Sequence, residues 1–243
     1  MSGESLDLDD LVHRAWPAPC QESLDGWVLR YADGVTKRAN SVLPWATPDD
    51  LDNAVDAAEK FYAERGLPCV FSMGPRATPG LDEMLAARGY RLVDETVSMV
   101  APMIGKPATA AHDVKIAGHP AEAWLAAWWA VDGRFGQDGL AAAERIVRGV
   151  PASYAAVERD GAPVAVGRSV LRGGTLGIYC MATLPHARRQ GLGRAVLRAL
   201  LAHGRARGAS QAYLVVVASN HAARAMYASE GFTPSAGYHY RVR

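Results

Sequence analysis

The stretch TLPHARRQGLGRAVLRALLAHGRARG, residues 183–208, places a basic, glycine-containing loop directly before a helical pattern. Apolar residues recur at helical spacing and arginines take the other side, which predicts an amphipathic helix beginning close to Gly191. The first turn of such a helix presents unpaired N–H groups and partial positive charge to the loop, which suits an anion. The expected inward-facing residues are Leu192, Ala195, Val196, Ala199, Leu200 and His203, and the outward-facing ones Arg194, Arg198, Arg205 and Arg207.

The composition of the loop indicates a phosphate ligand. Gly191 and Gly193 leave the amides open, and Arg188, Arg189 and Arg194 carry guanidinium groups that match phosphate oxygens. The alternative, a solvated basic face before an ordinary helix start, leaves two helix-weakening glycines unexplained. No lysine follows as in a P-loop, and a dinucleotide fingerprint lacks its third glycine and its acidic residue.

The whole chain is that of a globular protein. It has 243 residues, 49% of them hydrophobic, and its net charge of +1 gives no overall attraction to nucleic acid or acidic membranes. The three cysteines, Cys20, Cys69 and Cys180, are widely spaced, which argues against a disulfide framework and a structural zinc site. No run approaches the length of a membrane span, and the N-terminus has no apolar signal region, so we expect a cytoplasmic protein.

Helical and strand patterns alternate along the chain, which predicts a mixed α/β fold. A Pro- and Ala-rich segment at 101–112 suggests a domain boundary, placed between residues 106 and 107. The N-terminal side shows a hairpin turning at Asp33-Gly34. Further elements are expected as a helix at 48–65, a strand at 69–73, a helix at 81–89 and a strand at 95–102. The C-terminal side is expected to have helices at 121–131 and 139–149, a hairpin turning at Asp160-Gly161, strands at 176–184, 212–217 and 238–243, and a helix at 221–230.

The two halves resemble each other. Gly66 and Gly89 end helices 23 residues apart, and Gly208 and Gly231 do the same. Each second glycine precedes an aromatic residue, and both halves have an Asp-Gly turn, which indicates a duplicated unit. Chance coincidence of ordinary helix-strand-helix spacings is the alternative.

These residues resemble the GCN5-related N-acetyltransferase (GNAT) superfamily. The likeness rests on Arg188-x-x-Gly191-x-Gly193, preceded by MATLP and followed by SNHAARAMYASEGF, and covers about residues 112–243. It implies acetyl-CoA as co-substrate, no metal, and an amine acceptor on a small molecule or protein. It also implies a tandem GNAT-like fold of two similar halves, each with a central mixed β-sheet flanked by helices. Residues 1–106 would then form a degenerate GNAT-like domain without the pyrophosphate loop, and residues 107–243 the acetyl-CoA-binding domain.

The resemblance assigns a set of cofactor-binding residues. The backbone of Met181, Ala182 and Thr183 would hold pantetheine, Asn220 would contact the same arm, and Tyr227 would lie near the thioester sulfur as general acid. The residues expected around the pyrophosphate are Arg188, Arg189, Gln190, Gly191, Leu192, Gly193 and Arg194.

Helical spacing is consistent with this assignment. Asn220, Ala223 and Tyr227 share one face, because seven residues make about two turns. Their structural alternatives are a helix cap for Asn220 and a core position for Tyr227. With an offset of 142, the N-terminal half has Thr78 and Leu85 at the Asn220 and Tyr227 positions, and acids where the other half has arginines, so it should not bind pyrophosphate in the same way.

The general base is not apparent from the sequence. An alkylamine is protonated at neutral pH, so a base or a water chain is expected, yet the strand Leu214–Val217 carries no acid. A low-pKa amine would need no base at all. The titratable candidates are Asp132, Glu158, His186 and His221.

Several points stay open at this stage. Trp124, Trp128, Trp129 and Phe135 are candidates for lining the acceptor pocket or for core packing, and Cys180 fits a small core residue. A homodimer is one option for the oligomeric state, with neither nucleic acid nor membrane as partner. The predicted function is an N-acetyltransferase that transfers acetyl directly in a ternary complex. The alternative is a catalytically weakened CoA-binding regulatory module, suggested by the missing strand carboxylate.

Overall fold

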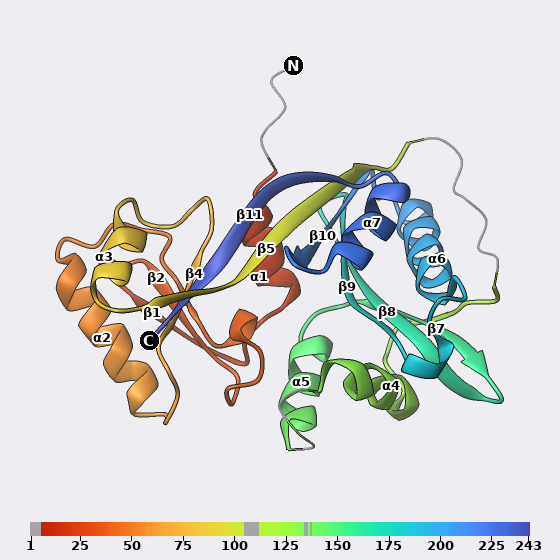
Figure 1. The fold of residues 1–243 in the computed structure, drawn as a ribbon, viewed down its shortest axis with the longest axis horizontal. Coiled ribbons are helices and arrows are strands. Elements are labelled where there is room, and N and C mark those ends of the chain that lie inside the picture. The colour runs from red at the N-terminus through yellow and green to blue at the C-terminus, as the bar shows by residue number, and fades with distance from the viewer. Residues whose placement is uncertain (1–5, 105–111, 134–135, 137) are drawn as a thin grey trace. The chain divides into compact units, whose positions relative to one another are not determined.

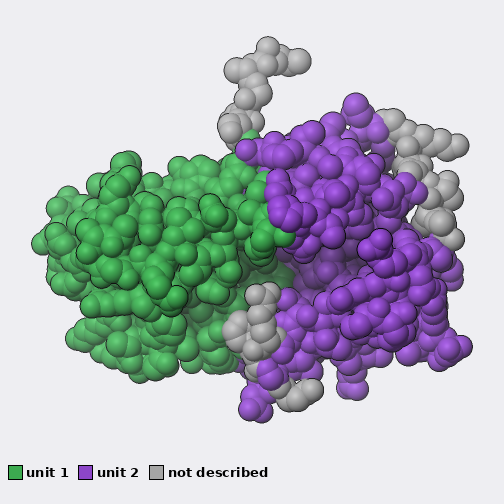
Figure 2. All heavy atoms as spheres, in the orientation of Figure 1, with its two compact units in different colours: residues 1–97, 217–219, 236–243 green, residues 98–216, 220–235 purple. Residues whose placement is uncertain are grey.

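The computed structural model describes residues 6–104, 112–133, 136 and 138–243. The chain forms two compact units (Figures 1 and 2). Unit 1 runs up to Val97 and also contains residues 217–219 and 236–243, whereas unit 2 contains residues 98–216 and 220–235. The last part of the chain, residues 236–243, therefore belongs to unit 1. The sequence-based division between residues 106 and 107 places these residues in the C-terminal domain instead.

Unit 1 combines short helices with strands. Its elements are α1 (Leu8–Ala15), β1 (Cys20–Leu24), β2 (Trp27–Tyr31), the 3-10 helix η1 (Lys37–Ala39), β3 (Val42–Leu43), α2 (Leu51–Ala63), β4 (Val70–Met73), α3 (Leu81–Ala87), the first part of β5 (Arg91–Pro102) and the last part of β11 (Thr233–Val242). Their hydrogen-bonded order is β1-β2-β3-β4-β11. Strands β3 and β4 are parallel, and β11 is antiparallel to β4.

Unit 2 contains the predicted loop and helix. Its elements are the rest of β5, β6 (Lys115–Ala117), α4 (Glu122–Asp132), α5 (Gly139–Arg148), β7 (Ser153–Arg159), β8 (Ala162–Arg172), β9 (Thr175–Thr183), the 3-10 helix η2 (Pro185–Ala187), α6 (Leu192–Ala206), β10 (Gln211–Val217), α7 (His221–Ser229) and the start of β11. The strand order is β11-β5-β10-β9-β8-β7-β6. Strands β9 and β10 are parallel, and β6 to β9 are antiparallel neighbours.

Helix α6 begins where the sequence predicts. Gly191 is its N-cap, with φ of 76°, a left-handed conformation that glycine adopts without strain. The buried stripe includes Leu192, Ala195, Val196 and Leu200, as predicted, while Ala199 and His203 are half-buried. The helix lies close to β8, because a Cβ at Gly167 would come within 2.7 Å of Val196. In Figure 1, α6 and α4 lie on opposite sides of strands β7 to β9.

The two units share the spacing of their elements. Subtracting 142 from the bounds of α6, β10, α7 and β11 gives 50–64, 69–75, 79–87 and 91–100, which coincide closely with α2, β4, α3 and β5. Upstream of the loop the offset is 135, since Gly177 pairs with Tyr213 as Val42 pairs with Phe71. Unit 1 thus lacks seven residues between its third strand and the following helix.

One predicted turn is different in the structure. Strands β2 and β3 do pair antiparallel, but residues 32–41 between them form a longer connection that includes η1 rather than a tight turn at Asp33-Gly34. Asn40 holds this connection, because its Oδ1 accepts hydrogen bonds from the N–H groups of Ala32 (2.8 Å) and Gly34 (3.0 Å). The tight hairpin turns instead at Asp25-Gly26, which lies 135 residues before Asp160-Gly161.

Candidate active site

A cavity of about 830 Å³ lies in unit 2 beside the N-terminus of α6. A volume of this size is typical of a ligand site. Twelve of the thirteen predicted cofactor-binding residues line it, all except Gln190. The lining residues are Val131, Met181, Ala182, Thr183, Ala187, Arg188, Arg189, Gly191, Leu192, Gly193, Arg194, Asn220, Ala222, Ala223, Met226 and Tyr227.

The open N-terminus of α6 gives the cavity its anion-binding character. No side chain caps this helix, so the first-turn N–H groups have no capping oxygen from Gly191. A Cβ at Gly191 would meet only His112 Nε2, at 3.9 Å, so the space beside this residue is nearly open. Uncapped amides next to open space can donate hydrogen bonds to the oxygens of a phosphate group.

The arginines around the loop have different partners. Arg188 donates from Nε to the carbonyl oxygen of Thr183 (3.1 Å). Arg194 lies 3.2 Å from the Glu230 carboxylate, which Arg198 also binds through two hydrogen bonds of 2.8 and 2.9 Å. Glu230 therefore orients two arginines on one side of α6 and offsets part of their charge. Sequence reasoning missed this carboxylate, although the spacing of four residues between the arginines was a signal for a shared partner.

Gln190 stands apart from the cavity and anchors the loop. Arg159 donates to its side-chain oxygen, and His112 Nε2 lies 3.1 Å from its carbonyl oxygen. These contacts connect the loop to β7 and to the segment that precedes β6. We therefore regard Gln190 as a residue that shapes the loop.

Strand β9 separates from β10 as it enters the cavity. Their parallel pairing runs from Thr175 to Ile178 of β9. Beyond Ile178, β9 has an irregularity in its pairing with β8, opposite Val166 to Arg168. Cys180 within this irregularity has φ of 52° and is half-buried. Because β9 no longer pairs with β10 there, Met181 and Thr183 can line the cavity. An arm with amide groups could pair with this stretch of backbone.

Helix α7 supplies the opposite wall. Asn220 is its N-cap and accepts a hydrogen bond from the N–H of Ala223 (3.1 Å), so the capping role considered from the sequence is present. Tyr227 is 7% exposed, and burial raises the pKa of its phenol to about 12. The phenol is therefore neutral at physiological pH and retains its proton for donation.

The other predicted residues lie elsewhere. Trp124, Trp128 and Trp129 are 1–6% exposed and none lines the cavity, so they belong to the core of unit 2. From this part of the chain the cavity instead receives Val131, which periodicity did not single out. Phe135 lies outside the described residues.

The candidate general bases do not line the cavity either. Glu158 pairs with Lys115, Asp132 ends α4, His186 is in η2 and His221 begins α7. Among the described residues, no group of three or more His, Cys, Asp or Glu side chains forms a metal site. No helix in the described ranges is long and apolar enough to cross a membrane.

Unit 1 closes the corresponding position with its own side chains. Thr78, which corresponds to Asn220, donates its N–H to the Pro44 carbonyl (2.8 Å). Its hydroxyl lies 3.0 and 2.5 Å from the carbonyl oxygens of Pro44 and Ala46. The buried Trp27 also donates to the Ala46 carbonyl (2.8 Å). Unit 2 has a space between β9 and α7. At the corresponding position of unit 1, side chains and their internal hydrogen bonds occupy that space.

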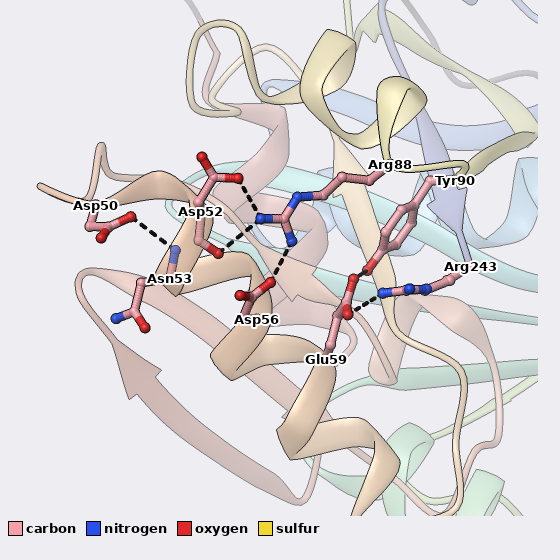
Figure 3. A network of polar contacts seen from close by, with 8 residues as sticks. All are labelled: Asp50, Asp52, Asn53, Asp56, Glu59, Arg88, Tyr90 and Arg243. Atoms are coloured by element: carbon pink, nitrogen blue, oxygen red, sulfur yellow. Dashed lines mark hydrogen bonds and ion pairs between the residues drawn. The ribbon is translucent and has the colours of Figure 1, made fainter.

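The helix that corresponds to α6 is acidic at its start (Figure 3). Asp50 caps α2 and accepts a hydrogen bond from the N–H of Asn53 (3.0 Å). Arg88 binds Asp52 in the first turn of α2 and Asp56 one turn further along the helix. A carboxylate thus occupies the helix N-terminus of unit 1, where unit 2 leaves its amides open.

Strands that separate beside an uncapped, glycine-started helix, in a mixed sheet of this order, define a GNAT protein. The family described as "Probable histone acetyltransferase Rv0428c C-terminal" matches residues 7–242, and the chain belongs to it. A relative from Bacillus subtilis (strain 168), described as uncharacterized N-acetyltransferase YobR, is 29% identical over 242 residues, 97% of each chain.

Solved structures show the same fold. A GCN5-related N-acetyltransferase from Kribbella flavida is 19% identical and has a TM-score of 0.63, over 97% of this chain and 92% of that one. A tandem GNAT protein from the clavulanic acid biosynthesis pathway is 15% identical and has a TM-score of 0.62, over 79% of this chain and 69% of that one. The family match confirms the predicted superfamily, and these structures confirm the predicted fold class.

Proposed function

We propose that the chain is an acetyl-CoA-dependent N-acetyltransferase that acts on a primary amine by direct transfer in a ternary complex. The observation that carries the proposal is the convergence of twelve predicted residues on one cavity beside an uncapped helix N-terminus. The acceptor belongs to a small molecule or a protein, and the name of the matching family, which mentions a histone acetyltransferase, is compatible with a protein acceptor. The proposed location is the cytoplasm.

The proposal gives the loop and strand separate roles. Gly191 and Gly193 present helix amides to the pyrophosphate, and Arg188, Arg189 and Arg194 supply positive charge around it. The backbone of Met181 to Thr183 pairs with the pantetheine arm. Asn220 keeps its side-chain NH2 group available for the same arm, while its side-chain oxygen caps α7.

The chemistry needs a neutral amine and a donor for the leaving thiolate. The amine lone pair forms a C–N bond to the thioester carbonyl, and collapse of the tetrahedral intermediate breaks the C–S bond. Tyr227 then donates a hydrogen bond to the sulfur that receives the electron pair. The proton lost by the amine passes to water, because none of the four candidate bases lines the cavity.

A regulatory CoA-binding module is the second candidate. It is favoured by one observation, namely that neither β10 nor the cavity lining carries a carboxylate. Release of CoA thiol in the presence of an amine panel distinguishes the two, because a binding module would bind CoA without turnover.

Binding is tested by the thermal shift that CoA produces. A ligand at 100 times its dissociation constant stabilises the native state by about 2.7 kcal/mol, so CoA should raise the melting temperature. Gly191→Asp places a carboxylate beside the anion site and should abolish the shift. Gly208→Asp is the matched control, because Gly208 ends the same helix with φ of 92° and faces open space. An unchanged shift in Gly191→Asp would refute the pyrophosphate assignment.

A further inference from the structure

A second cavity of about 740 Å³ lies in unit 2, where α5 and α6 end. Loops at 118–119 and 149–152, the start of β7 and the last turn of α6 contribute to its wall. It shares no lining residue with the cavity beside the N-terminus of α6. Its polar lining residues are His119, Arg148, Ser153, Tyr154, Ser169, His203 and Arg207.

The charge in this cavity has one sign. Among the described residues that line it, none is acidic, whereas two arginines and two histidines come from three different parts of the chain. Arg148 is partly neutralised, since it binds Glu144 (2.7 Å) and the Pro120 carbonyl (2.9 Å). The charge directed into the cavity therefore comes mainly from Arg207.

Stabilisation of the helix explains why basic residues lie near the end of α6, but it does not explain where the Arg207 side chain points. A basic residue near a helix C-terminus complements the helix dipole. The side chain of Arg207, however, reaches across to β7 and donates from Nη1 to Ser153 Oγ (3.2 Å), its one side-chain hydrogen bond among the described residues. Nη2 and Nε stay available for a ligand. Ser153 and its strand partner Ser169, which also lines the cavity, are 4% and 2% exposed, so two buried serines lie on this wall.

His203 adds a group that responds to an anion. Burial, and then the charge of Arg207, lower the pKa of its imidazole. The other charged or titratable residues that line the cavity are Arg148 from α5, His119 from the loop before α4 and Tyr154 from β7, whose hydroxyl donates to the Val147 carbonyl (2.6 Å). A bound anion would oppose the effect of Arg207 and favour the protonated imidazole.

We propose that this cavity binds a small organic anion through a phosphate or carboxylate group, held by Arg207 together with His203 and the two buried serines. The volume is in the range of small-molecule sites, and a guanidinium beside the Ser153 hydroxyl matches the oxygens of either group. The proposal is independent of acetyl transfer and assigns a second ligand site to unit 2.

The test is calorimetric titration with inorganic phosphate and, separately, with citrate. Both titrations use protein saturated with CoA and are repeated in Gly191→Asp, so that the loop at 188–194 does not contribute. We expect binding of at least one of the two anions. Binding of phosphate alone assigns a phosphorylated ligand, and binding of citrate alone assigns a carboxylate. Absence of binding in both arms would mean a cavity that holds only solvent and would overturn the proposal.

Variants locate the bound anion. Arg207→Gln should weaken its binding at least tenfold, whereas Arg205→Gln removes the same charge from the same turn outside the cavity and should leave it unchanged. His203→Gln gives a second comparison if Arg207→Gln is poorly folded. Equal affinities in wild type, Arg207→Gln and His203→Gln would place the anion elsewhere and overturn the proposal.

Discussion

The hydroxyl of Tyr227 lies in a buried position, and that burial limits what the group can do. With a pKa of about 12, the phenol is a weaker acid than an ordinary thiol, whose pKa is about 8.5. Full proton transfer to a leaving thiolate is therefore uphill. Donation of a hydrogen bond to the developing charge is not, so the proposed role of Tyr227 is to stabilise the thiolate, with solvent completing the protonation.

Tyr227→Phe tests this role at the scale of one atom. The ring and its packing against Phe232 remain, so folding and CoA affinity should change little. The turnover number should fall about 10²-fold, the lower end for loss of one transition-state hydrogen bond. Steady-state kinetics and a CoA melting shift provide the measurement, with Tyr31→Phe in unit 1 as the control. A fully active Tyr227→Phe enzyme would leave this tyrosine as a packing residue.

At the scale of elements, a single carboxylate anchors the C-terminal strand within unit 1. Asp82 on α3 receives two hydrogen bonds from Arg241 on β11 (2.9 and 2.7 Å) and lies 2.7 Å from His239 Nε2 on the same strand. The hydrogen bond from Arg241, followed by that from His239, holds the pKa of Asp82 at about 2, although burial opposes this. The ionised carboxylate therefore contributes to the free energy of folding.

Asp82→Asn should lower the free energy of unfolding at pH 7 by about 1–2 kcal/mol, the range for partly exposed charge-assisted hydrogen bonds. Because the folded pKa is below the unfolded value near 3.8, the contribution is fully present above about pH 4 and is lost as the pH falls towards 2. Chemical denaturation of both proteins across this range measures it. A difference that stays constant down to pH 2 would exclude ionisation of Asp82 as its source.

At the scale of the whole molecule, the two units have similar elements but different capacities. The seven residues that unit 1 lacks fall where unit 2 has its loop, and Asp50 caps the helix that follows. Thr78 and Trp27 fill the position that corresponds to the proposed pantetheine site of unit 2. We propose that unit 1 is a degenerate repeat with a structural or substrate-shaping role.

The chain should therefore bind one CoA. Titration calorimetry of the full-length protein should give a stoichiometry of one per chain, because the amides at the start of α6 are uncapped, whereas Asp50 caps α2, the corresponding helix of unit 1. Gly191→Asp should reduce this to zero, and Gly208→Asp should leave it at one. Two equivalent sites in the wild type would contradict the degenerate-repeat interpretation.

Much of the fold was predictable because it depends on short-range patterns. Glycines before an apolar stripe of period 3.6 specify α6, and their effect does not depend on the rest of the chain. The same holds for α2, β4, α3 and β10, which lie close to their predicted ranges, and for β7 and β8, which turn at Asp160-Gly161 as predicted. Helix α1 and strands β1 and β6 were not predicted from the sequence.

The amino-acid sequence by itself determined the loop, its helix and the superfamily, because these are written in neighbouring residues. Only the tertiary structure decided that Glu230 orients Arg194, that Val131 rather than a tryptophan reaches the cavity, and that Thr78 closes the matching space in unit 1. Each of these depends on two side chains or backbone groups from elements distant in the chain. Their meeting is set by how strands and helices pack, which no local pattern encodes.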